Sequence, residues 1–97
     1  MKLSINKKQI ASLCQSNDIS YLGLFGSYAR GDQKKRSDID ILVEFKEIKS
    51  LFELADVQIQ LENIFDKKID LILKNSVKKS YKPYIFKDLV PLYEEKQ

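Results

Sequence analysis

Two aspartates one residue apart, Asp38 and Asp40, are the residues of this chain best suited to chemistry. They open an apolar run ending at Phe45, in which apolar and polar residues alternate as in a half-buried strand. Side chains two residues apart in a strand point to the same face, so the carboxylates are expected about 6–7 Å apart along it. Two such carboxylates repel each other and raise each other's pKa. A divalent cation bound between them would relieve that repulsion.

A short turn upstream has the composition of a phosphate-binding turn. Gly26 and Ser27 directly follow an apolar run, 19–25, that predicts a strand. Glycine permits a tight turn, serine is a favoured helix N-cap, and Gly31 would end the short helix that Ser27 begins. The free N–H groups at such a helix start attract phosphate. Arg30, within this helix, is either a surface residue or a phosphate contact.

A third carboxylate, Asp70, belongs to another predicted strand, 69–73. Apolar residues occupy one face of this strand and Asp70 occupies the other. Magnesium prefers oxygen ligands and usually binds through one or two carboxylates together with substrate phosphates. Asp70 could complete a two-metal site or accept the proton of an attacking hydroxyl. The three carboxylates and the turn together indicate metal-assisted phosphoryl or nucleotidyl transfer.

Each of these features also has an ordinary structural explanation. Gly26 and Ser27 could form a plain turn, and the aspartate pair could lie on a solvated strand face. Asp70 could be an exposed strand residue, and the basic run at 34–36 a solvated loop. The order and spacing of the parts favour the functional interpretation, because independent structural causes rarely assemble one site.

Composition excludes several other kinds of site. The 97 residues contain no histidine, so Ser-His-Asp and Cys-His sites and histidine zinc sites are impossible. The single cysteine, Cys14, cannot form an internal disulfide and is expected in the core. The net charge of +3 suits an anionic ligand but only weakly supports nucleic-acid binding. Without an apolar signal segment or a run near the roughly 20 residues of a membrane span, we expect a cytoplasmic protein.

The remaining pattern predicts the elements that hold these residues in place. A first helix is expected from a cap at Ser4 to about Ser16. A longer helix is expected from a capping box at 50–53 to about Phe65. Its predicted buried stripe is Leu51, Leu54, Ala55, Leu61 and Ile64 or Phe65.

At the C-terminal end, Pro83 suits the first turn of a last helix that ends near Leu89. A short edge strand is expected at 90–93, and residues 94–97 are expected to fray. The predicted fold is therefore one small α/β (α+β) domain spanning residues 1–97. It would have a mixed sheet of three or four strands and helices mainly on one face.

The stretch that begins at Gly26 resembles a known motif. Gly26-Ser27, ten intervening residues and Asp38-Ile39-Asp40 match the GS-x10-DxD pattern of the DNA polymerase β-like nucleotidyltransferases. The fuller text GSYARGDQKKRSDIDILVEF, with KKIDLIL and KPYIFKDLVPLYEE, resembles the minimal nucleotidyltransferase family in particular. These short proteins, often called MntA-like, are paired with HEPN-domain toxins. The long motif is specific, whereas GS or DxD alone would be weak.

The resemblance implies how a nucleotide would bind. Gly26 and Ser27 would hold the β- and γ-phosphates of a nucleoside triphosphate, with ATP as the expected substrate. Arg30 and Ser37 are further candidates for nucleotide binding.

For the carboxylates, the resemblance implies a site for two Mg²⁺ ions. Asp38 and Asp40 would bind the metal, and Asp70 would be the third carboxylate, orienting or deprotonating the acceptor hydroxyl. The attack would fall on the α-phosphate, with pyrophosphate leaving.

The leading hypothesis is an antitoxin that transfers AMP from ATP to a tyrosine of a HEPN-domain toxin ribonuclease encoded next to it. One alternative is a non-catalytic antitoxin that neutralises its toxin by binding, although such a binder need not keep an intact GS and DxD. Another is nucleotidyl transfer to a small molecule or an RNA end. The segment at 80–87, SYKPYIFK, is the one weak candidate for RNA contact and is expected mainly to pack as a helix. No membrane or nucleic-acid partner is expected.

Overall fold

A four-stranded mixed sheet forms the centre of the computed structural model, which describes residues 3–47 and 49–95. Its strands are β1 (Ile19–Phe25), β2 (Ile39–Phe45), β3 (Ile69–Leu73) and β4 (Val90–Glu94). They lie in the order β3-β2-β1-β4, with β1 antiparallel to β2 and β4 and with β2 parallel to β3. The predicted bounds of β1 and β3 are confirmed. β2 begins one residue later than predicted, so Asp38 lies just before it.

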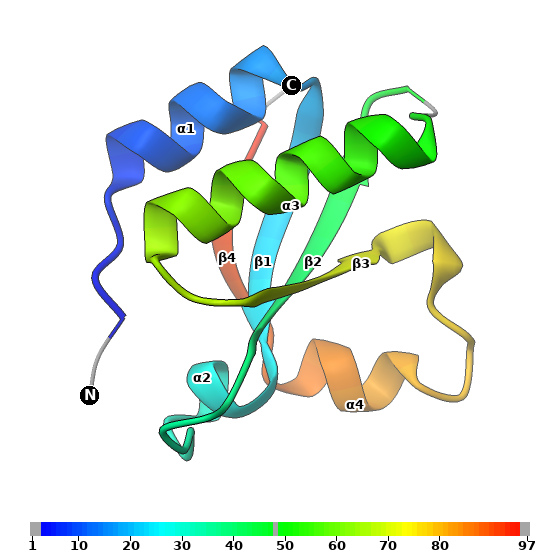
Figure 1. Cartoon of the computed structure of the whole chain (residues 1–97). Coiled ribbons are helices and arrows are strands. Elements are labelled where there is room, and N and C mark those ends of the chain that lie inside the picture. The colour runs from blue at the N-terminus through cyan, green and yellow to red at the C-terminus, as the bar shows by residue number, and fades with distance from the viewer. Residues whose placement is uncertain (1–2, 48, 96–97) are drawn as a thin grey trace.

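The two longer helices cover one face of this sheet (Figure 1). They are α1 (Lys7–Ser16) and α3 (Leu51–Phe65). The short helices α2 (Gly26–Arg30) and α4 (Lys82–Lys87) lie at the lower end of the sheet in this view, and the 3-10 turn η1 (Lys74–Ser76) follows β3. This α+β arrangement confirms the predicted fold class. None of the helices in the described ranges combines the length and apolar character needed to cross a membrane.

The main core lies between this face and the two helices. Inward-facing residues of the strands pack against one stripe from each helix, which leaves Cys14 fully buried as expected. The core residues are Ile10, Leu13, Cys14, Ile19, Leu22, Leu24, Ile39, Ile41, Val43, Val57, Leu61, Phe65 and Ile69.

The opposite face of the sheet is also partly covered. Leu42, on the same strand face as Asp40, is fully buried. A Cβ on Gly23 of β1 would lie 2.7 Å from both a methyl of Leu89 and the hydroxyl of Tyr21. The segment after α4 therefore approaches the back of β1 closely only because residue 23 is a glycine.

The start of α1 differs from the prediction. The helix is capped by Asn6 rather than Ser4, and the Asn6 side chain accepts the N–H of Gln9 at 3.1 Å. Asparagine caps helices as well as serine does, and here it directly precedes the first helical residue. At the other end of the chain, α4 has Pro83 in its first turn as expected but ends at Lys87. Residue 94 belongs to β4 rather than fraying, and residues 96–97 lie outside the described range.

The buried face of α3 is rotated relative to the prediction. The capping prediction is confirmed, because Ser50 accepts the N–H of Glu53 at 3.2 Å. The fully buried positions, however, follow an i, i+4, i+8 series, Val57, Leu61 and Phe65. The predicted burial of Leu51 and Ala55 is wrong: both are exposed, Leu51 by 81%. Apolar residues occur on two sides of this helix, so periodicity alone did not reveal which side faces the sheet.

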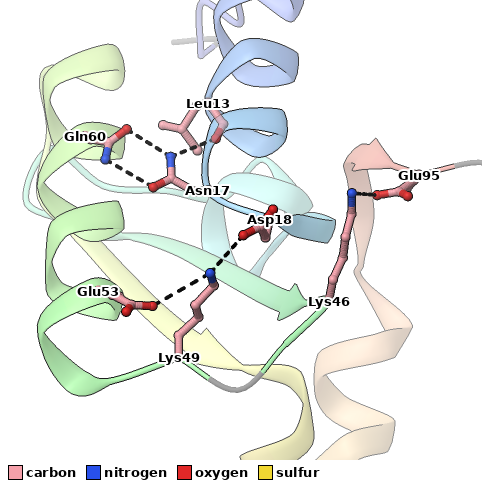
Figure 2. A network of polar contacts seen from close by, with 8 residues as sticks. All are labelled: Leu13, Asn17, Asp18, Lys46, Lys49, Glu53, Gln60 and Glu95. Atoms are coloured by element: carbon pink, nitrogen blue, oxygen red, sulfur yellow. Dashed lines mark hydrogen bonds and ion pairs between the residues drawn. The ribbon is translucent and has the colours of Figure 1, made fainter.

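Polar contacts tie the elements together at the end of the sheet where β1 begins and β2 ends (Figure 2). The Asn17 side-chain amide donates to the Leu13 carbonyl at 2.8 Å and to the Gln60 amide oxygen at 3.2 Å, which links α1 to α3. The Lys49 ammonium lies 3.0 Å from the carboxylate of Asp18. Its hydrogen bond holds the pKa of Asp18 below the usual value. These contacts lie at the end of the sheet opposite Asp38 and Asp40.

A comparison of two leucines of α3, one buried and one exposed, tests this packing. Leu61→Ala is expected to lower the free energy of unfolding by about 2–5 kcal/mol, because Leu61 is fully buried and its truncation leaves a cavity. Leu51→Ala, at the exposed start of the same helix, should change it by less than about 0.5 kcal/mol. Urea unfolding of both variants measures the difference. Equal losses would contradict the observed rotation of α3.

Candidate active site

The sheet register places two of the candidate carboxylates side by side. Asp40 of β2 and Asp70 of β3 are direct partners in the parallel ladder. The start of β2 is fixed by a hydrogen bond from the N–H of Ile39 to the carbonyl of Lys68, 3.0 Å long. Asp38 directly precedes this anchor point and is exposed. The three predicted carboxylates therefore lie together at adjacent ends of two neighbouring strands.

The predicted phosphate-binding turn is in contact with this group. Phe25, the last residue of β1, pairs with Asp40, and Gly26 follows with a φ of +73°. A Cβ on Gly26 would overlap the Oδ2 of Asp40 and lie 3.0 Å from its Cγ. Residue 26 must therefore be glycine for two reasons, its positive φ and the close approach of a carboxylate.

The predicted role of Ser27 as the N-cap of α2 is wrong. Phe25, in extended conformation, occupies the cap position, and no side chain of the described residues caps the helix. The helix starts at Gly26 because glycine reaches the required backbone geometry without a side chain. Ser27 lies in the first turn, where its carbonyl accepts the N–H groups of Gly31 and Asp32 at 2.9 and 3.1 Å. Gly31 ends the helix in the left-handed conformation, as predicted.

The carboxylates interact strongly through Asp40. Burial, followed by the charges of Asp70 and Asp38, raises the pKa of Asp40 to about 6. The guanidinium of Arg30 acts in the opposite direction and lowers this pKa. A half-buried carboxyl that has two acidic neighbours and one basic neighbour therefore keeps its proton to a higher pH than an ordinary aspartate, up to about pH 6. Such a perturbed group in a cluster is typical of a functional site.

Arg30 is held at the edge of the site by two carboxylates. Its Nε lies 3.1 Å from Asp32 Oδ2 and its Nη1 lies 3.3 Å from Asp88 Oδ2. The second contact joins the end of α2 to the residue that follows α4. Sequence analysis did not single out Asp88, and no local pattern could have done so, since 58 residues separate it from Arg30.

Ser37 shapes the loop that leads to the aspartates. Its hydroxyl oxygen accepts the N–H of Lys34 at 2.8 Å, and its own N–H donates to the Lys34 carbonyl at 3.0 Å. These two bonds close the turn just before Asp38. Direct contact between Ser37 and a nucleotide stays a prediction.

The donor set at this site fits magnesium. It consists of carboxylate oxygens, which are the hard ligands that Mg²⁺ prefers. A cation bound beside Asp40 would also offset the burial and the neighbouring negative charges that raise the pKa of this carboxyl. Within residues 3–47 and 49–95, however, no three acidic side chains already converge as a set of metal ligands. Substrate phosphates would therefore supply part of the coordination, as is usual for this ion.

Comparison with known proteins assigns the family. The sequence profile of the family described as "Polymerase beta, Nucleotidyltransferase" matches residues 8–97. The chain belongs to this nucleotidyltransferase family. Protein adenylyltransferase MntA of Thermococcus cleftensis is 34% identical over 88 residues, which cover 91% of this chain and 86% of the relative. A predicted protein adenylyltransferase of Methanocaldococcus jannaschii is 38% identical over 90 residues, covering 93% and 97%. The resemblance to MntA-like nucleotidyltransferases is thereby confirmed.

Solved structures share the fold of this nucleotidyltransferase. A toxin–antitoxin crystal structure with AMP-PNP matches with a TM-score of 0.77 at 25% identity, covering 94% of this chain and 75% of the other. A complex of a tri-AMPylated Shewanella oneidensis HEPN toxin with its MNT antitoxin matches with a TM-score of 0.68 at 21% identity, covering 92% and 70%. The second likeness shows the fold alone.

The coupling between the acids is testable by titration. Asp70→Asn should lower the pKa of Asp40 below about 6, because it removes a neighbouring negative charge. Arg30→Gln should raise it, because it removes a neighbouring positive charge. Carboxyl ¹³C chemical shifts followed against pH measure both changes. An Asp40 pKa that moves in neither variant would contradict the coupling.

The glycines at the two ends of α2, Gly26 at its start and Gly31 at its C-cap, separate steric contact from backbone strain. Gly26 and Gly31 both have positive φ, but a Cβ on Gly31 would meet nothing within 4 Å. Gly26→Ala should therefore cost more stability than Gly31→Ala and should abolish nucleotidyl transfer, since it displaces Asp40. Thermal unfolding and an activity assay of both variants measure this. Equal effects would show that the contact with Asp40 is unimportant.

Proposed function

We propose that this nucleotidyltransferase is an antitoxin that transfers AMP from ATP to a tyrosine of a HEPN-domain toxin ribonuclease and thereby inactivates it. The observation that carries the proposal is the register that aligns Asp40 with Asp70 and brings Asp40 against Gly26. Similarity to a protein adenylyltransferase named MntA and to a toxin–antitoxin complex with AMP-PNP supports it. A cytoplasmic location and a toxin gene next to this one are part of the proposal.

In this proposal the turn binds the phosphates of ATP and the carboxylates bind the metal ions. The uncapped N–H groups at the start of α2, at Gly26 and Ser27, donate to the β- and γ-phosphates of ATP. Asp38, Asp40 and Asp70 are the residues that would hold two Mg²⁺ ions. Bound there, magnesium would neutralise phosphate charge and polarise the α-phosphate. Arg30, which already lies close enough to Asp40 to influence its pKa, contributes a further positive charge beside the phosphates.

The transfer step then follows from these positions. The tyrosine oxygen attacks the α-phosphorus and a new O–P bond forms. The bond from the α-phosphorus to the oxygen that bridges to the β-phosphate breaks, and pyrophosphate leaves. Asp70, which is exposed beside Asp40, accepts the phenolic proton.

The openness of the site supports a macromolecular acceptor. Asp38 and Asp70 are both exposed in the isolated chain, so the described residues do not enclose an acceptor pocket around them. A small acceptor would gain little binding energy on such a surface. A protein acceptor brings its own surface to the carboxylates.

Transfer to the toxin is the direct test of this function. The protein is incubated with ATP labelled at the α-phosphate, Mg²⁺ and the HEPN partner. We expect label on the partner, none on a partner whose acceptor tyrosine is replaced by phenylalanine, and none without Mg²⁺. An unlabelled partner in a reaction with demonstrably folded enzyme would refute the enzymatic proposal.

Removing the metal ligands separates catalysis from binding. The double variant Asp38→Asn, Asp40→Asn should lose transfer by at least about 10³-fold while staying folded. The matched control is Asp56→Asn, Asp66→Asn, which changes two exposed aspartates at α3 and should keep full activity. A double variant that still neutralised the toxin fully would favour inhibition by binding alone.

The same double variant should be the more stable protein at neutral pH. The pKa of Asp40 rises from 3.8 to about 6 on folding, so the folded state binds its proton more tightly. Stability therefore falls as the pH rises from about 4 to about 6. Above that window the variant should gain about 1 kcal/mol, a value reduced for the partial exposure of Asp40. Urea unfolding at pH 4 and pH 7 measures the gain, and a variant less stable at both values would contradict it.

A further inference from the structure

A groove lies beside α4, and one of its lining residues belongs to the strand that carries Asp70. Its volume is about 390 Å³. It is lined mainly by Ile72 of β3, by Val77 and Lys78 of the following connection, and by Tyr81, Tyr84 and Ile85 at α4. We refer to it as the α4 groove.

The strand β3 connects the α4 groove to the carboxylates. Ile72 and Asp70 are two residues apart on one strand, so their side chains share a face and lie about 6–7 Å apart along it. The neighbouring strand repeats the arrangement, because Asp40 pairs with Asp70 and Leu42 pairs with Ile72. A segment bound in the groove would therefore have its next few residues at the carboxylates.

The aromatic residues of the groove are exposed to solvent. Tyr81 is 58% exposed and Tyr84 is 75% exposed. The sequence-based expectation that the segment at 80–87 mainly packs as a helix is therefore wrong for both tyrosines. Tyrosine is enriched in protein interfaces, where its ring packs and its hydroxyl stays hydrogen-bonded.

The connection and helix that form the groove carry only positive charges, whereas the carboxylate cluster lies just beyond them at Asp70 and Asp40. Residues 71–87 contain five lysines and no Asp or Glu. Lys78, Lys79 and Lys82 are exposed, and none of the ion pairs within the described residues involves them. Such a rim complements an acidic partner, increases its rate of association and disfavours basic surfaces.

We propose that the α4 groove docks an acidic segment of the acceptor protein, with an aromatic or aliphatic side chain inserted between Ile72, Val77 and Tyr84. The proposal rests on the proposed function, since it describes how the acceptor reaches Asp70. An apolar lining beneath a basic rim favours a protein segment over RNA, because a phosphate backbone gains nothing from Ile72, Val77 and Ile85.

Two matched pairs of lysines test the docking. Lys78→Glu, Lys79→Glu reverses the charge of the lysine that lines the groove and of its exposed neighbour. Lys7→Glu, Lys8→Glu makes the same change at two consecutive exposed lysines on α1. Tyr84→Ala removes an exposed aromatic side chain with little risk to folding. For each variant, the Kd for the toxin, the KM for toxin and the KM for ATP are measured at low and high salt.

We expect both groove variants to raise the toxin Kd and KM at least tenfold and to leave the KM for ATP within twofold. The lysine variant should also weaken the salt dependence, whereas Tyr84→Ala, which changes no charge, should leave it unchanged. The α1 variant should match the wild type in all of these. The Kd of each variant for a single-stranded RNA oligonucleotide is measured beside these. Unchanged toxin Kd in both groove variants would overturn the proposal, as would loss of RNA binding with an unchanged toxin KM. A wild-type protein that binds toxin but transfers no AMP would refute the proposed function. The toxin Kd of the groove variants would still test whether the toxin docks in the α4 groove.

Discussion

The repulsion among three carboxylates at adjacent strand ends is the constraint on which the site depends. Asp40 lies between Asp70 on the next strand and the glycine turn that follows β1. Its burial, followed by the charges of Asp70 and Asp38, raises its pKa to about 6. A one-residue shift in the register between β2 and β3 would move Asp70 to the opposite face of the sheet and separate it from Asp40. The register is therefore as important to the chemistry as the acids are. The buried series Val57, Leu61 and Phe65 of α3 helps to hold it by packing the crossover helix onto the sheet.

The polar network of Figure 2 and the candidate carboxylate cluster lie at opposite ends of the sheet. The amide pair of Asn17 and Gln60 and the ion pairs of Lys49 join α1, α3 and the β2–α3 connection at one end (Figure 2). At the other end, like charges cluster and the start of α2 has no side-chain cap among the described residues. Proteins commonly break the rules of favourable local structure at functional sites and compensate elsewhere. A ligand that brings cations and phosphates would satisfy both the acids and the free N–H groups.

The parts of the structure that sequence could predict are those with a local pattern. The apolar run at 19–25 predicted β1, and the alternation at 69–73 predicted β3 together with Asp70. The spacing of glycine, serine and aspartates predicted the turn and the pair Asp38 and Asp40. Other features depend on tertiary contacts. The Arg30–Asp88 pair spans 58 residues, and the buried side of α3 was ambiguous because Leu51 and Val57 are equally apolar. The N-cap of α2 was wrongly predicted at Ser27, because the helix already begins at Gly26 and Phe25 occupies the cap position. The exposure of Tyr84 could not be predicted from the sequence, because it depends on how α4 packs against the rest of the protein.

Proton release on magnesium binding tests the central claim most directly. If Mg²⁺ is held by the crowded carboxylates, its binding must displace the proton that Asp40 retains. Calorimetric titration with Mg²⁺ at pH 6, in two buffers of different ionisation enthalpy, should show release of about half a proton per site, since the pKa of Asp40 is about 6. The release should vanish at pH 8 and in Asp40→Asn. Magnesium binding at pH 6 without proton release would contradict the account, because the ion would then be held away from Asp40.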